Sequence, residues 1–235
     1  NGATETATIP SGAANTFVQD DNGDLPDGFV GSATVTSDQP IAASVVELGP
    51  TTVFAYNGFT GGSTQVVMPL VNANNYGYVT GIQIQNAGDT DTDVTVAYTP
   101  SSAGTACTEQ RTIAAGASAT FALYVFTYSG SAPLAEDCVM GETFVGSAEV
   151  SANSADQPLV AIVNQLHPSN NKGASYGGFD PAAGTDAVAM PLIMDRNYGY
   201  FTGFSVMNVG SANTTVTCTY TDNAHTDVAT LAPGE

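Results

Sequence analysis

Apolar and polar residues alternate along most of the chain, and a period of two predicts β-strands. Between positions 76 and 84, for example, one face carries Tyr76, Tyr78, Thr80, Ile82 and Ile84. Such stretches are rich in β-branched and aromatic residues, and turn residues interrupt them roughly every 8–12 positions. No window has a helical period with caps. The pattern predicts an all-β chain of antiparallel sandwiches.

Several short motifs occur twice, at separations of one small domain. NYGYVTG at 75–81 returns as NYGYFTG at 197–203, which is 122 residues later. MPL, GSA and QP also recur, at 68–70 and 190–192, 31–33 and 146–148, and 39–40 and 157–158. A period above 100 residues indicates tandem domains, not a solenoid of short repeats.

A further motif occurs three times and shows where the given sequence starts and stops relative to the repeating unit. TIPSGA at 8–13 matches TIAAGA at 112–117 and TLAPG at 230–234. The sequence as given is therefore expected to open within one unit and to stop within another. We expect one complete immunoglobulin-like β-sandwich of about seven strands over residues 67–187.

The flanking regions, 1–66 and 188–235, are predicted to be complementary half-units. Residues 1–66 hold only the later strands of a unit, and residues 188–235 hold only the early strands. The strands are expected at 6–9, 15–18, 31–36, 41–48 and 52–56, and at 189–193, 200–208, 215–220 and 227–231. A longer apolar strand is expected at 119–126 in the central unit.

Neither half-unit can bury its apolar face alone, so a partner is expected to cover it. The residues expected to meet are Ile9, Phe17, Val35, Phe204, Val206 and Val216. The half-units could close on each other within one molecule, head to tail between molecules, or along a longer polypeptide. The TI-x-x-G element occurs in both half-units, so ring closure would supply one copy too many. A surplus strand favours assembly by strand addition.

Charge narrows the range of partners. The chain carries 22 acidic and three basic residues, for a net charge of −19. Nucleic acid and anionic membranes are therefore very poor partners, because phosphate contacts need Lys and Arg. The longest apolar run, 121–126, is too short to span a bilayer.

A surface rich in Thr and Ser with almost no Lys is typical of secreted proteins and offers acceptors for glycans. No basic leader precedes Asn1, which suggests a mature form or a fragment.

Two of the three cysteines flank an insertion. Phe17 and Phe121 are 104 residues apart, whereas Gly31 and Gly146 are 115 apart, so the central unit is 11 residues longer in between. Cys107 and Cys138 bracket this insertion, and a disulfide between them would indicate an oxidising compartment. The alternative is two unpaired thiols. Cys218 stands where the first copy has Val96, and we interpret it as a small buried hydrophobe.

The repeated motifs resemble those of tandem immunoglobulin-like repeats in secreted bacterial and archaeal surface proteins, of the cell-adhesion-related type. The resemblance rests on TLAPG at 230–234, TIAAGASATF at 112–121, LPDGFVGSA at 25–33 and DQPIAA at 38–43. It covers nearly the whole chain and implies stalks, surface layers, adhesins or filaments. The half-units also look like those of extracellular filament subunits that exchange strands.

Two local motifs suggest ligand or modification sites. Asp20, Asn22, Asp24 and Asp27 surround a glycine turn and could supply hard oxygens to calcium, although no EF-hand glutamate follows. The alternative is a solvated acidic turn. Asn213 begins the sequon NTT in a predicted turn, where a glycan would be accessible.

The tyrosine pairs at 76/78 and 198/200 could stack on sugars. Their shared face with Ile82 and Ile84 favours core packing instead. Catalysis has no support, since the two histidines stand outside any recognised nucleophile, metal or phosphate motif. We therefore expect a non-enzymatic structural subunit of an extracellular filament at the cell surface, assembled from copies of itself. The alternative is an adhesin or carbohydrate-binding stalk module.

Overall fold

The computed structural model describes residues 3–122, 135–139, 141–154, 157–221 and 225–235. The prediction of an all-β chain is confirmed, since every strand pair in these ranges is antiparallel. The helical segments there are short 3-10 turns at Gln19–Asp21, Pro168–Asn170 and Pro181–Ala183.

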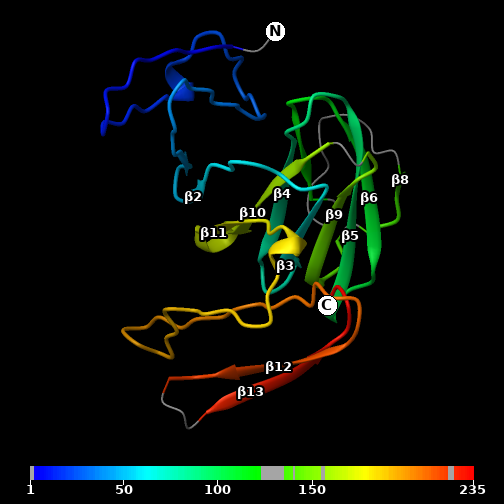
Figure 1. The fold of residues 1–235 in the computed structure, drawn as a ribbon. Helices are drawn as coiled ribbons and strands as arrows, with labels where there is room; N and C mark the ends of the chain where they lie inside the picture. The colour runs from blue at the N-terminus through cyan, green and yellow to red at the C-terminus, as the bar shows by residue number, and fades with distance from the viewer. Residues whose placement is uncertain (1–2, 123–134, 140, 155–156, 222–224) are drawn as a thin grey trace.

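The centre of the molecule is two antiparallel sheets packed around one core (Figure 1). The larger sheet contains, in spatial order, β3 (Gln65–Ala73), β9 (Phe144–Ala152), β5 (Thr92–Ala103), β6 (Cys107–Ile113) and β8 (Ala135–Glu136). The smaller contains β11 (Lys172–Gly177), β10 (Leu159–His167), β4 (Val79–Asn86) and β7 (Ser118–Phe121). We call this two-sheet body the central sandwich.

The core forms because alternate residues of both sheets point between them. Strand β9 shows the pattern: Ala148 and Val150 are fully buried, while Glu149 between them is half-buried. The large side chains with no exposed surface include Phe121, Phe144, Met68, Ile84 and Leu159, which come from both sheets. A bridge between Val67 and Phe179 ties the chain after β11 back to β3. The predicted strand at 119–126 is β7 up to Phe121, and residues 123–126 lie outside the described ranges.

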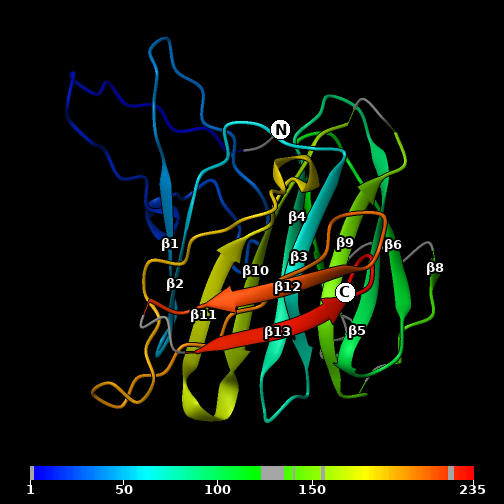
Figure 2. The ribbon, with the colours of Figure 1, turned by 60° about the horizontal axis from the view of Figure 1, so that its bottom comes forward.

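The flanking segments form two separate hairpins on different sides of the central sandwich (Figures 1 and 2). Near the N-terminus, β1 (Ser44–Leu48) pairs with β2 (Val53–Asn57), and near the C-terminus β12 (Thr214–Thr219) pairs with β13 (Thr226–Leu231). Strand β2 lies against β11, where the Ser175 hydroxyl donates to the carbonyl of Ala55 at 2.7 Å.

Several predicted strands in the flanking segments are absent from the structure. Segments 6–9, 15–18 and 31–36 have no strand pairing, nor do 189–193 and 201–208, and Tyr200 makes only an isolated bridge with Asn197. A strand exists only where a neighbour accepts and donates its backbone hydrogen bonds. The alternating pattern was present in these segments, but the single chain brings no partner strand to them.

Candidate assembly surfaces

The C-terminal half-unit (residues 188–235) reproduces the local geometry of the central sandwich at equivalent positions. Its NYGY turn is closed by hydrogen bonds between Asn197 and Tyr200, as Asn75 and Tyr78 close the first. Tyr198 has φ 50° where Tyr76 has 48°. A positive φ is uncommon for a bulky residue, so its recurrence shows that the same turn is specified twice.

A buried asparagine organises the same loop in both copies. The Asn86 side-chain amide donates to the carbonyls of Thr90 at 2.7 Å and Ile113 at 3.1 Å. Asn208, which is 122 residues later, donates to Ala212 at 2.8 Å and Leu231 at 3.1 Å. The NYGY turn and the asparagine-centred loop of the central sandwich therefore recur in the C-terminal half-unit, where the β12–β13 hairpin stands at the positions of β5 and β6.

In the N-terminal half-unit (residues 1–66), one hairpin corresponds to a hairpin of the central sandwich. In the β1–β2 hairpin, Ser44 lies opposite Asn57 and Leu48 opposite Val53. The β10–β11 hairpin pairs Ile162 with Gly177 and Leu166 with Gly173. The two hairpins correspond with an offset of 118 residues between β1 and β10 and of 120 residues between β2 and β11, so the second hairpin is two residues longer at its turn. By the repeat alignment, the segments equivalent to β7 and β9 also lie in residues 1–66, although they form no strands in the single chain.

Residues equivalent to the core of the central sandwich are exposed in both half-units. Val35 is 58% exposed, whereas its equivalent Val150 is fully buried. Phe204 is 39% exposed, whereas its equivalent Ile82 is 1% exposed. Of the other residues expected to meet, Ile9 and Val206 are exposed and Phe17 and Val216 are half-buried. Further exposed apolar residues of the two half-units are Phe29, Val30, Ile41, Leu48, Val188, Leu192 and Phe201.

By the repeat alignment, the segments that one half-unit lacks are those that the other contains. In the central sandwich β9 lies between β3 and β5, and β4 lies between β10 and β7. Equivalents of β3, β4 and β5 are in the C-terminal half-unit, and equivalents of β7, β9 and β10 are in the N-terminal one. The two half-units would therefore interdigitate in both sheets, although in the single chain they stay apart (Figure 1).

The acidic turn does not gather its carboxylates. Residues 19–21 form a 3-10 turn, and the Asn22 side chain accepts a hydrogen bond from the Asp24 amide at 3.0 Å, as in an Asx turn. Asp20, Asn22, Asp24 and Asp27 are not brought together as ligands. Within the described ranges, the one group of three close ligand atoms is Cys107, Asp137 and Cys138, and both its sulfurs belong to a disulfide.

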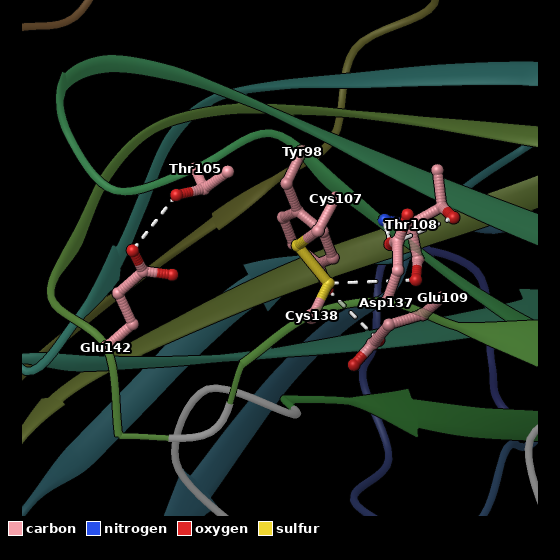
Figure 3. Close-up of a disulfide and its surroundings, with 8 residues drawn as sticks. All are labelled: Tyr98, Thr105, Cys107, Thr108, Glu109, Asp137, Cys138 and Glu142. Atoms are coloured by element: carbon pink, nitrogen blue, oxygen red, sulfur yellow. Dashed lines mark hydrogen bonds between the residues drawn. A yellow bond between two sulfur atoms is a disulfide. The ribbon is translucent and has the colours of Figure 1, made fainter.

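Cys107 and Cys138 are joined in a disulfide across the insertion (Figure 3). Their Cα atoms are 5.0 Å apart, and the bond ties the segment after β8 to the start of β6. The hydroxyl of Thr105 donates to the carboxylate of Glu142 at 3.0 Å in the same region. Cys218 is a free, half-buried thiol on β12.

The remaining predicted positions are at the surface. Asn213 is exposed directly before β12, which is sterically compatible with a glycan. The prediction that Tyr76, Tyr198 and Tyr200 pack in the core is wrong, because these side chains are 92%, 94% and 67% exposed. The positive-φ turn breaks the strand alternation at these positions. Tyr78 instead packs edge-on against His167, with ring centroids 4.9 Å apart.

No helix in the described ranges is long and apolar enough to cross a membrane. Comparison of the chain with protein-family models, curated proteins and solved structures finds no match. The structure and the internal repeat therefore carry the functional argument.

Proposed function

We propose that this protein is the structural subunit of an extracellular filament built from immunoglobulin-like sandwiches. The C-terminal half-unit of one copy and the N-terminal half-unit of the next copy form one composite sandwich. The observation that carries the proposal is that the two half-units hold complementary strands of a sandwich the chain also contains whole. Their exposed apolar residues stand at its core positions.

The central sandwich gives the register of the composite one. Val150 lies opposite Val96, and the equivalent pair across the composite is Val35 of one copy and Cys218 of the other. Ile82 lies opposite Phe121 and Val163, and the equivalent set is Phe204, Phe17 and Val45. At these positions the apolar residues of the two half-units then face each other.

A second copy is the occupant because the two surfaces are on different sides of the central sandwich in one chain. Surfaces that differ from each other form heterologous contacts, and such contacts propagate head to tail unless a rotation closes them into a ring. The disulfide supports an extracellular location, since such bonds persist in oxidising compartments.

A cysteine cross-link tests the proposal. In an antiparallel pair, directly opposed Cα atoms are about 4.5–5.5 Å apart, within the range that a disulfide spans. Val35→Cys is expected to bond to Cys218 of the neighbouring copy and to give a ladder of multimers on a non-reducing gel. The matched control is Thr36→Cys, because the adjacent side chain points to the other face of the strand.

The outcomes separate the modes of closure. A ladder with Val35→Cys and none with Thr36→Cys supports head-to-tail assembly. A cross-linked monomer shows closure within one chain and overturns the filament. No cross-link with either variant overturns complementation itself.

The exposed tyrosines favour a second candidate, a carbohydrate-binding stalk module. Tyr76 and Tyr198 occupy identical turns in the two copies, and an exposed ring can stack on a sugar. This function predicts retention on an insoluble polysaccharide such as chitin or cellulose, abolished by the double variant Tyr76→Ala and Tyr198→Ala. Equal retention of the wild type and the double variant would rule it out.

A further inference from the structure

One hydrogen bond is repeated at two places where the central sandwich meets a half-unit. The hydroxyl of Ser32, in the N-terminal half-unit, donates to the carbonyl of Gly116 at 2.7 Å. The hydroxyl of Ser147, in the central sandwich, donates to the carbonyl of Gly234 in the C-terminal half-unit. Ser32 and Ser147 are equivalent in the repeat through the GSA motif, and Gly116 and Gly234 are equivalent through the TI-x-x-G motif.

Ser147 lies on the outer face of its sheet, whereas Ser32 is half-buried in a segment without strand pairing. Ala148 and Val150 of β9 point into the core, so Ser147 points out, yet it is only 2% exposed. The turn that contains Gly234 lies close by, with Gly234 also near Thr99 of β5, and the C-terminus lies over β9 and β5 (Figure 2). The turn that contains Gly234 therefore packs on the outer face of the central sandwich.

Each accepting turn is fixed to its own sandwich. The Gly116 amide donates to the Asn86 carbonyl at 3.0 Å, and the Gly234 amide donates to the Asn208 carbonyl at 2.9 Å. Gly116 has φ 70° and Gly234 has φ 80°, so both turns adopt a conformation that favours glycine. A hydrogen bond from the serine to this carbonyl therefore restrains the orientation of the whole following sandwich relative to the preceding one, because the accepting turn does not move independently of its sandwich.

We infer that successive sandwiches along the fibre dock through this one junction, in which the β9 serine of one sandwich binds the glycine carbonyl of the next. One rotation and one translation then relate every sandwich to its neighbour, whether complete or composite. The inference rests on the proposed function for the composite sandwich. Both junctions, however, lie within a single chain and can be measured there.

Spin-label distances test the equivalence of the junctions. Cys218→Val provides a background without a free thiol and restores the residue type of Val96. One doubly labelled variant carries Thr36→Cys and Thr112→Cys, and the other carries the equivalent changes Ser151→Cys and Thr230→Cys. Dilution with unlabelled chain isolates the distances within one chain. The two distance distributions are expected to coincide in mean and width.

The serine variants test the hydrogen bond itself. Ser32→Ala is expected to broaden the 36–112 distribution alone, and Ser147→Ala the 151–230 distribution alone. Different means in the parent pair, or no change with either serine variant, would overturn the inference. These failures are distinct from failure of the proposed function. A cross-linked ladder together with unequal distances would support the filament and contradict the common junction. Equal distances without a ladder would support the common junction and contradict the filament.

Discussion

The phenol of Tyr98 donates a hydrogen bond to the carboxylate of Glu109 at 3.1 Å inside the central sandwich, and both side chains are buried. The equivalent residues of the C-terminal half-unit, Tyr220 and Asp227, make the same bond at 2.7 Å at the surface of the single chain. This retained polar pair supports the proposal that a second copy completes the sandwich and buries it.

This pair predicts a response to alkaline pH. The hydrogen bond to Asp227, with lesser contributions from desolvation and charge, raises the pKa of Tyr220 from 10.0 to about 12. A raised tyrosine pKa means that the bond contributes fully below pH 10 and is lost as pH rises through about 12. Absorbance titration should show a tyrosine that ionises near pH 12.

The variants identify that tyrosine. Tyr220→Phe should reduce the component near pH 12 by one tyrosine, while the late ionisation of Tyr56 and Tyr176, whose pKa values burial also raises, should remain. Asp227→Asn should move the Tyr220 component back toward pH 10, because the carboxylate that accepts the phenol's hydrogen bond is gone. A titration that is unchanged in Tyr220→Phe would contradict the assignment.

Substitution of an exposed core equivalent predicts a loss of assembly without loss of the fold. Phe204 corresponds to the buried Ile82, so Phe204→Gln should weaken association by about 1.5–3 kcal/mol, roughly 10- to 100-fold in dissociation constant. Val228 is a matched control because it is 65% exposed and corresponds to the polar Gln110. Val228→Gln should leave association unchanged.

Analytical ultracentrifugation measures the effect on association, and circular dichroism checks that both variants stay folded. If Phe204→Gln and Val228→Gln associate equally well, residue 204 is not covered by a partner, and the composite register fails.

The sequence was sufficient to predict an all-β chain and its internal repeat, but not which strands pair. The period of two around Ile82 and Ile84 correctly predicted strand β4, because β10 and β7 of the same chain pair with it on either side. The same period around Phe204 and Val206 predicted a strand that the single chain does not form. Pairing is a long-range property, and alternation reports only the faces of a strand. Tyr76 was misjudged for a local reason, since a positive φ before Gly77 breaks the alternation.

The disulfide predicts a selective effect of reduction. The Cys107–Cys138 bond spans a sequence separation of 31, and loss of such a cross-link costs about 3–4 kcal/mol in the chain-entropy model. In the C-terminal half-unit, His225 stands at the position of Cys107, so the composite sandwich has no such bond. Reduction should therefore lower the melting temperature of the central sandwich. At temperatures below that lowered melting temperature, fibre length should not change on reduction.

Calorimetry with and without reductant, together with light scattering, separates the two effects. The double variant Cys107→Ser and Cys138→Ser should behave as the reduced protein does. Fibres that shorten on reduction at a temperature where the central sandwich stays folded would show that the disulfide acts in assembly after all.

Charge predicts that salt promotes assembly. The N-terminal half-unit carries seven acidic residues without Lys or Arg, and the C-terminal one carries four acidic residues against Arg196. The two docking partners therefore repel each other, and apolar burial must overcome that repulsion. Raising the ionic strength from about 0.01 M to about 0.15 M shortens the Debye length from about 30 Å to about 8 Å. Light scattering should then show faster growth and longer fibres. Assembly driven by attraction between opposite charges would slow under the same change, so the sign of the salt effect separates apolar complementation from electrostatic docking.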